Sequence, residues 1–143
     1  MERKQKGFTL VELAVVVVII GVLAAFAVPR FMASVERSKA AEAFNYLSAV
    51  QSAQERYHAR QGTYATLIVD LDIKFTAPKY FGVGEITAGS TSSLEDSWKL
   101  TLTRTGSAAG YGAYTVTFNE QGFSDDVAES TIVSHTDINP MQT

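Results

Sequence analysis

The stretch Gly7-Phe8-Thr9-Leu10-Val11-Glu12, with the apolar run that follows it to Val28, decides the fold of this chain. Between Phe8 and Val28 only Thr9 and Glu12 are polar. A helix over these 21 residues would be about 30 Å long, which is the thickness of a bilayer core. Three basic side chains and one acidic side chain precede Gly7. The positive-inside rule therefore places the N-terminus in the cytoplasm and the rest of the chain outside.

A plain membrane anchor and a cleaved secretory signal are two interpretations of this segment. The second has a basic start, an apolar run and a small-x-small site at Ala25-Phe26-Ala27, and it predicts an exported soluble domain that starts at Val28. Glu12 counts against both, because an ionised carboxylate at the centre of a membrane costs about 2.5–3.5 kcal/mol. Neither an anchor nor a cleaved signal gains from such a residue. We expect Glu12 either to have a partner or to lie solvated at the level of the headgroups.

The residues from Gly7 to Glu12 resemble the class III signal of type IV pilins and related prepilins. The resemblance extends through the apolar run, Gly21 and Pro29, and more loosely to about residue 62. It implies that residues 1–7 are a leader, which a prepilin peptidase removes by cutting between Gly7 and Phe8. The same enzyme is then expected to methylate the new N-terminus of Phe8. Glu12 matches the acid of the family's motif.

The chemistry of these residues fits the resemblance. Gly7 has no side chain that would obstruct a protease. Cleavage would create an α-amine on Phe8, and in a stack of apolar helices this cation can meet Glu12 of a neighbouring subunit. Removing one member of a buried ion pair costs about 3–5 kcal/mol, because the other charge is left unpaired. We therefore expect Glu12 to set the axial register of an incoming subunit.

The long helix is expected to have two parts, a transmembrane and polymerisation helix over residues 8–29 and an amphipathic helix over residues 30–62. Gly21 is a weak helix former and Pro29 removes a backbone hydrogen bond. The segment between them is either a simple kink or a stretch that unwinds in a filament. Charged residues, Glu36 among them, are expected to fill the outer faces of the amphipathic part. Its apolar stripe, at steps of three and four, is Ala40, Ala43, Phe44, Leu47, Val50 and Tyr57.

Residues 63–143 are expected to form a globular head around an antiparallel sheet. Residues 98–103 and 114–118 alternate apolar and polar side chains, which predicts a hairpin with a glycine-rich loop over 104–113. A short edge strand is expected at 80–83, a helical turn at 70–74, a surface loop over 84–97 and a further strand at 132–133. Residue 122 is expected to begin a tail. The fold class is therefore α+β: the long-helix design of pilins, with the hydrophobic half of the helix protruding and the amphipathic half packed on a small sheet.

Composition excludes several classes of protein. The 143 residues include no cysteine. The C-terminal region therefore lacks the disulfide that ties this region in better-known pilins. Packing, a bound ion or neighbouring subunits must hold the tail instead. The net charge is −3 and becomes −5 once the leader is lost, which argues against direct nucleic-acid binding. No catalytic constellation or cofactor motif is present, so we expect neither an enzyme nor a bound cofactor.

One acidic cluster is a weak candidate for a metal site. Asp125, Asp126 and Glu129 offer oxygen ligands of the kind that calcium prefers, and major pseudopilins of type II secretion carry a C-terminal calcium site. The EF-hand spacing is missing, however, and such charged stretches are usually solvated. The favoured interpretation is a solvated acidic loop without a metal.

The sequence and the resemblance together predict a structural subunit of a type IV pilus. The expected partners are copies of itself in a helical homopolymer, the prepilin peptidase and methyltransferase, an inner-membrane assembly platform with its ATPase, and the membrane before assembly. The expected location is the inner membrane, then the extracellular pilus. The alternative is a pseudopilin of a type II secretion system in a periplasmic pseudopilus. Adhesion, motility, DNA uptake and secretion depend on the machinery, and the sequence does not separate them.

Overall fold

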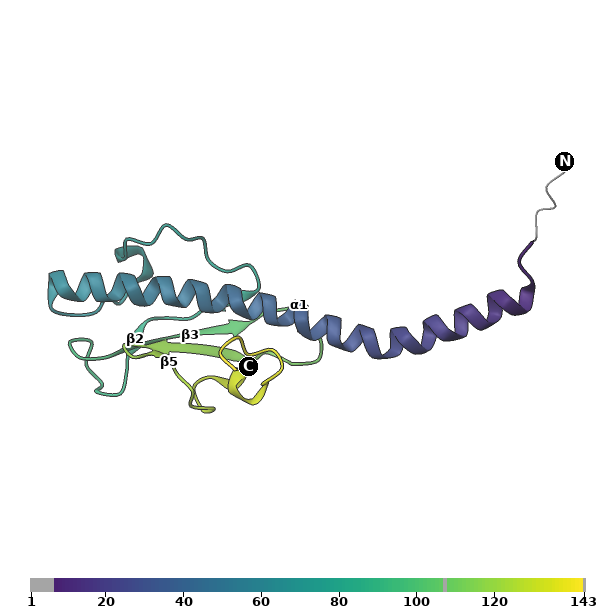
Figure 1. Cartoon of the computed structure of the whole chain (residues 1–143). Coiled ribbons are helices and arrows are strands. Elements are labelled where there is room, and N and C mark those ends of the chain that lie inside the picture. The colour runs from purple at the N-terminus through teal and green to yellow at the C-terminus, as the bar shows by residue number, and fades with distance from the viewer. Residues whose placement is uncertain (1–6, 107, 143) are drawn as a thin grey trace.

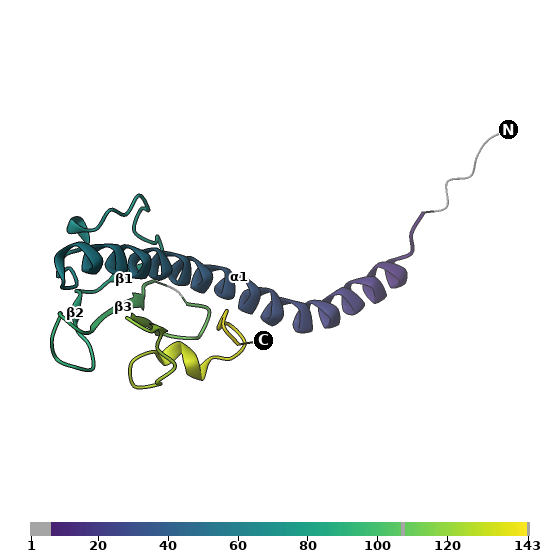
Figure 2. The same ribbon diagram turned by 60° about the vertical axis from the view of Figure 1, so that its left-hand side comes forward.

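The computed structural model describes residues 7–106 and 108–142, and it shows one long helix attached to a small head (Figures 1 and 2). The helix projects from the head at its N-terminal half and lies across the sheet at its C-terminal half. The α+β pilin architecture expected from the sequence is therefore confirmed. The elements in chain order are α1 Leu10–Gln61, η1 Ile68–Asp70, β1 Phe81–Val83, β2 Thr87–Ala88, β3 Trp98–Arg104, β4 Thr115–Asn119, β5 Gly122–Phe123 and η2 Thr131–Ser134.

Helix α1 begins and ends with side-chain and backbone caps that its sequence specifies. Thr9 is the N-cap, and Gly62 ends the helix with φ of 75°, a left-handed conformation that glycine adopts at little cost. The helix is continuous through Gly21 and Pro29 and curves within its protruding half in both views. Of the two sequence-based alternatives, this single chain shows a bent helix without an unwound stretch. Unwinding between Gly21 and Pro29 in a filament stays a prediction.

The sheet is antiparallel, with β3 at its centre. Its order is β1-β3-β4-β5, and β2 also pairs with β3. In the β3–β4 register, Leu100 lies opposite Phe118 and Leu102 opposite Val116, as the predicted hairpin requires. The alternating side chains of these strands are buried against α1, which confirms the predicted core face. Its fully buried members include Trp98, Leu100, Leu102 and Val116 from the sheet and Ala40, Ala43, Leu47 and Val50 from the helix.

Four expectations about the minor elements were wrong. The short helix lies at 68–70 instead of 70–74, the predicted loop over 84–97 contains strand β2, and the presumed start of the tail at residue 122 is strand β5. Residues 132–133 lie in the 3₁₀ helix η2 and not in a strand. The physical reason is that the hydroxyls of Ser130 and Thr131 accept the backbone N–H groups of Thr117 and Thr115, both at 2.8 Å. These side chains occupy the donors of β4 that another strand would use.

Candidate assembly site on the protruding helix

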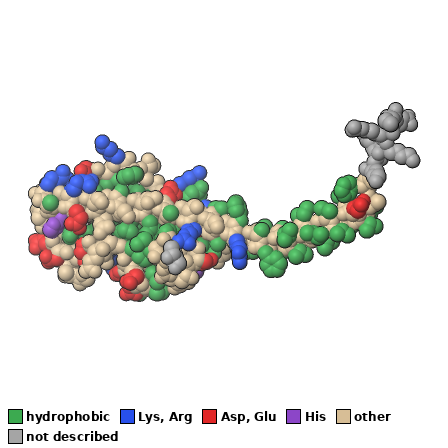
Figure 3. Space-filling view, viewed as in Figure 1, with side chains coloured by type: hydrophobic (Ala, Val, Ile, Leu, Met, Phe, Trp, Pro, Cys, Tyr) green, Lys and Arg blue, Asp and Glu red, His purple; other side chains and the backbone are tan. Residues whose placement is uncertain are grey.

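The protruding half of α1 leaves its apolar side chains uncovered within the chain. Every residue from Gly7 to Met32 is exposed, and Figure 3 shows hydrophobic side chains all along this part of the helix. Leu10 is 84% exposed and Phe26 is 73% exposed. This helix is long and apolar enough to cross a membrane, and none of its apolar span is buried inside the head. Such a surface needs lipid or other protein around it, because burial of apolar area is worth about 25 cal/mol per Å².

Glu12 takes part in a capping box at the start of α1. Its Oε2 accepts hydrogen bonds from the Thr9 backbone N–H at 2.8 Å and from the Thr9 hydroxyl at 2.7 Å. The Thr9 Oγ1 in turn accepts the Glu12 backbone N–H at 3.2 Å. Two otherwise unpaired N–H groups at the helix start are thereby satisfied. The sequence analysis missed this role of Thr9, although the Thr-x-x-Glu spacing ahead of an apolar run is a known signature of it.

The capping box fixes where the carboxylate lies in the single subunit. Both side-chain bonds to Glu12 among the described residues end at Oε2, and Glu12 is exposed. Oε1 is therefore available as an acceptor for an incoming cation. Phe8 precedes the helix and is 81% exposed, and among the described residues a Cβ on Gly7 would have no atom within 4 Å apart from those of its neighbours in the chain. The structure thus places the predicted cleavage, methylation and register residues together at one exposed end, while residues 1–6 lie outside the described residues.

A buried ionic network joins α1 to the sheet where the helix leaves the head. Glu36 is fully buried, and its two oxygens accept hydrogen bonds from Arg104 Nε at 2.5 Å and Nη2 at 3.1 Å. The Tyr114 hydroxyl donates to Glu36 Oε1 at 2.9 Å, and Lys39 Nζ lies 3.3 Å from Oε2. Burial alone would raise the pKa of the Glu36 carboxyl, but the bonds from Arg104 and Tyr114 hold it below its ordinary value.

The assignment of Glu36 to an outer face of the amphipathic helix was therefore wrong. Its position in the sequence resembles that of the exposed charges around it, and its partners are 68 and 78 residues away along the chain. Arg104 is the last residue of β3 and is only 3% exposed. No local pattern marks such a pair, since its members meet only when the sheet packs on the helix.

The tail without a disulfide is held by packing and hydrogen bonds. Ile132 and Ile138 are fully buried. The carbonyl of Gln142 accepts a hydrogen bond from Arg37 Nη2 at 3.1 Å, and the Ser130 hydroxyl accepts the N–H of Thr117. Packing, one of the three alternatives that the sequence left open for holding the tail, is therefore what the single chain displays.

The weak calcium candidates are not brought together as a site. Asp126 Oδ1 accepts the backbone N–H of Ala128 at 2.9 Å. Glu129 accepts the hydroxyl of Ser124 at 2.8 Å and lies 3.5 Å from Lys99 Nζ, while Asp125 is exposed. Within residues 7–106 and 108–142, no group of three or more histidine, cysteine or acidic side chains could hold a metal ion.

A long helix with an exposed apolar half, a capped acid at its tip and a small antiparallel sheet is the architecture of a pilin-like subunit. Residues 3–28 match the family model of the prokaryotic N-terminal methylation motif. Residues 29–127 match that of the type IV minor pilin ComP, described as a DNA uptake sequence receptor. The chain belongs to the type IV pilin family.

Individual relatives include both pilins and a secretion protein. The chain is 33% identical over 129 residues to the fimbrial protein EcpC of Eikenella corrodens, which covers 87% of this chain and 82% of that protein. It is 44% identical over 62 residues to the type IV major pilin protein PilA of Myxococcus xanthus, or 43% of this chain and 28% of PilA. It is 38% identical over 76 residues to the type II secretion system core protein G of Vibrio cholerae, about half of each protein. No solved structure matches the chain significantly.

Proposed function

We propose that this chain is a prepilin that is cut between Gly7 and Phe8, methylated on Phe8 and polymerised through α1 into a type IV pilus. The observation that carries the proposal is the uncovered apolar half of α1, which ends in the capped carboxylate of Glu12. A helix that is exposed in the single chain is stable in a membrane and, after extraction, in a bundle with other copies. The role is structural, since pilins are subunits and not enzymes.

Cleavage at Gly7 would place the new amine beside the helix start. The segment from Gly7 to Thr9 is not helical, so the scissile bond lies outside α1, where a protease can reach the backbone. In the assembled filament, the amine of Phe8 would pair with Glu12 of a neighbouring subunit. Methylation leaves that amine positively charged, so the pairing survives the modification. The capping hydrogen bonds from Thr9 hold the Glu12 carboxylate in place before the Phe8 amine of a neighbouring subunit binds it.

The proposed path begins in the inner membrane and ends outside the cell. Residues 8–29 would span the bilayer with the head on the far side, and an assembly platform with its cytoplasmic ATPase would extract the subunit. The alternative is a periplasmic pseudopilus, and the likeness to the secretion core protein supports it over about half of the chain. The pilus is favoured because the fimbrial relative is matched over most of both chains.

A separate question is whether this chain binds DNA directly, since the matched family is described as a receptor of DNA uptake sequences. Residues 30–143 carry nine lysines and arginines against thirteen acidic residues. Arg56, Lys99 and Arg104 each already pair with a carboxylate. Binding to the phosphate backbone depends on cations that displace counterions. We therefore expect no shift of duplex DNA by the full chain in detergent at low salt, and a salt-sensitive shift would contradict this expectation.

Cell fractionation tests the filament role. Cells that produce the chain are sheared, and the sheared fraction and the envelope are compared by immunoblot. A pilus subunit is expected in the sheared fraction, whereas a pseudopilin remains in the envelope. A Gly7→Val variant is the matched control, because it should stay in the envelope at the size of the uncut precursor. Release of this variant into the sheared fraction would contradict processing at Gly7.

A further inference from the structure

Cationic side chains gather at the junction where α1 leaves the head, at the end of the head that faces the proposed membrane. Figure 3 shows lysine and arginine side chains both above and below the helix at this point. Residues 30–143 carry nine lysines and arginines and thirteen acidic residues. Five of the cations and three of the acids belong to the junction, which leaves four cations and ten acids for the rest of the head. The junction cations are Arg30, Arg37, Lys39, Lys79 and Arg104, and the junction acids are Glu36, Glu42 and Asp137.

Contacts place these side chains around the first turns of α1 that touch the head. The ammonium groups of Lys39 and Lys79 lie 5.1 and 5.6 Å from the centre of the Tyr80 ring. The Arg37 guanidinium donates to a carbonyl of the tail at 3.1 Å. Arg30 lies seven residues before Arg37, which is nearly two helical turns, and is exposed. The head therefore presents a positive end toward the protruding half of α1.

The junction acids are engaged within the head and do not cancel the cations. Glu36 is buried in the ionic network described above. Asp137 accepts a hydrogen bond from the hydroxyl of Tyr111, and Glu42 accepts the backbone N–H of Lys79 at 3.1 Å. Because five cations face three acids, the junction as a whole stays positive.

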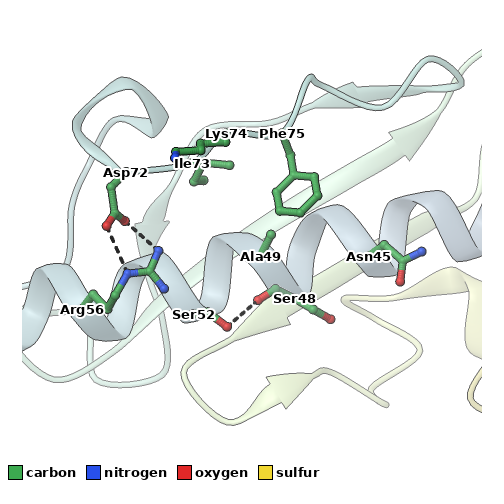
Figure 4. A pocket seen from close by; sticks show the side chains of 9 residues that line it. All are labelled: Asn45, Ser48, Ala49, Ser52, Arg56, Asp72, Ile73, Lys74 and Phe75. Atoms are coloured by element: carbon green, nitrogen blue, oxygen red, sulfur yellow. Dashed lines mark hydrogen bonds and ion pairs between the residues drawn. The ribbon is translucent and has the colours of Figure 1, made fainter.

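The exposed junction cations differ in their pairing from a cation at the far end of the head. In the part of the chain that the structure describes, no ion pair joins Arg30, Arg37 or Lys79 to a carboxylate. By contrast, Arg56 binds Asp72 with two distances of 2.7 and 3.1 Å (Figure 4). The exposed junction cations are therefore available to an anion outside the chain.

The position of these cations along α1 matches the depth of lipid headgroups. If residues 8–29 span the hydrocarbon core, Arg30 lies at its edge and Arg37 lies about 10 Å farther along the helix. Side chains of an α-helix lean toward its N-terminus, and long cationic side chains extend their charge toward the membrane surface. The headgroup layer adds about 5–8 Å on each side of the core, so both guanidinium groups lie within reach of it.

The cations lie on both sides of the helix, which favours a membrane surface over a single small anion. Lys39 follows Arg30 by nine residues, or about 180° around an α-helix. A hollow of about 290 Å³ lies beside Lys39. Its apolar walls include Phe31, Met32 and Val35. A phospholipid offers a phosphate to the ammonium group and apolar chain to these walls, whereas free phosphate offers only the first.

We propose that the exposed junction cations, above all Arg30, bind anionic phospholipid headgroups in the leaflet next to the head. The inference rests on the membrane stage of the proposed function and adds the lipid chemistry that the subunit recognises there. Phosphatidylglycerol represents this class, because its phosphate is negative and its headgroup carries no cation. Phosphatidylcholine is the matched neutral lipid, since its own cation cancels the charge of its phosphate.

The uneven charge of the head gives the membrane-bound subunit a defined orientation. An anionic surface attracts the junction cations and repels the rest of the head, which carries ten acids and only four cations. Both effects act within a screening length of about 8–10 Å. The membrane would thereby hold the helix at one depth and the head away from the lipid. This contact ends when the subunit leaves the membrane for the filament, so it acts only before assembly.

Native mass spectrometry of the full chain in detergent micelles tests the lipid preference. The chain is mixed with equal amounts of phosphatidylglycerol and phosphatidylcholine that have the same acyl chains, and the lipid adducts are counted. Every variant also carries Arg3→Gln, Lys4→Gln and Lys6→Gln, so that cations of the leader do not contribute. We expect phosphatidylglycerol adducts to exceed phosphatidylcholine adducts by about fivefold or more, since one cation near an anionic surface contributes about fivefold in affinity.

Arg30→Gln is the informative variant and Arg60→Gln is its matched control, because both arginines are exposed on α1. The first change should lower the ratio of the two adducts about fivefold, and the second should leave it unchanged. Arg30→Lys keeps the charge and should keep the ratio. Urea unfolding followed by Trp98 fluorescence checks that each variant retains a folded head.

Three results would overturn the inference while leaving the filament role intact. The first is equal numbers of the two lipid adducts on the chain with Arg30 in place. The second is an equal effect of Arg30→Gln and Arg60→Gln. The third is loss of the lipid preference when inorganic phosphate is added at constant ionic strength, which would assign the cations to a free anion.

One result would contradict more than the inference. If the chain carries no adduct of either lipid, the apolar half of α1 does not hold lipid. The membrane stage of the proposed function would then fail together with the proposed headgroup contact. Adducts of both lipids in equal number, by contrast, would support the membrane stage and refute only the preference for anionic headgroups.

Discussion

Replacing Glu36 by glutamine should destabilise the head more than any single exposed charge does. The change keeps the shape of the side chain but removes the negative charge opposite Arg104, which is only 3% exposed. Breaking a buried pair by removing one partner costs about 3–5 kcal/mol. Tyr114→Phe removes only the 2.9 Å hydrogen bond to the same carboxylate, so its expected cost is about 1.5–3 kcal/mol.

Trp98 provides the assay. It is the only tryptophan of the chain and is fully buried in the core, so its fluorescence reports unfolding of the head. The full chain in detergent micelles is unfolded with urea, and the free energies of unfolding of the variants are compared. Asp72→Asn is the matched control, because it removes one charge of an exposed ion pair at 2.7 Å and should cost about 0–1 kcal/mol. Equal effects of Glu36→Gln and Asp72→Asn would refute the reasoning.

The same network gives the stability of the head a defined dependence on pH. The pKa of Glu36 is lower in the folded chain than its ordinary value, mainly because Arg104 and Tyr114 outweigh the effect of burial. A lowered folded pKa means that the unfolded chain binds the proton more readily. The contribution of Glu36 is therefore complete above the ordinary glutamate pKa and is lost as the pH falls through the folded value. In Glu36→Gln this acid-dependent part should be missing from the urea midpoints.

Three further predictions concern the tip of α1 and the tail. Glu12→Gln should retain cleavage after Gly7, as judged by the mass of the membrane form, but reduce sheared filaments at least tenfold. Normal filament yield would contradict the role of Glu12 in register. Thr9→Val should cost the helix start about 1 kcal/mol and raise amide hydrogen exchange in its first turn only, and unchanged exchange there would contradict the capping box. Ser130→Ala removes the acceptor of the Thr117 N–H and should lower the free energy of unfolding in urea by about 1–3 kcal/mol. An effect below about 0.5 kcal/mol, which is typical of a surface change, would show that water replaces the Ser130 hydroxyl as acceptor.

The sequence predicted the parts of the fold that local patterns control. The long apolar run, the amphipathic stripe from Ala40 to Val50 and the alternating strands at 98–103 and 114–118 all specify their elements within a few residues. The hydroxyls of Ser130 and Thr131 were not predictable as substitutes for a strand, because their partners are 13 and 16 residues away. Two-residue strands such as β2 have too few side chains to show an alternation.

The candidate site was predictable to a similar extent. The motif from Gly7 to Glu12 identified the tip of the helix, and the Thr9 cap could have been read from the same residues. The burial of Glu36 could not be predicted from the sequence, since the charge and spacing of this residue resemble those of its exposed neighbours.

The measurement that tests the central claim most directly is the intact mass of this chain in filaments sheared from cells. Our account predicts a mass that corresponds to a chain starting at Phe8 plus one methyl group, in the sheared fraction. The same mass confined to the envelope would favour the pseudopilus instead. A chain that starts at Val28, in either fraction, would contradict assembly through the N-terminal helix altogether.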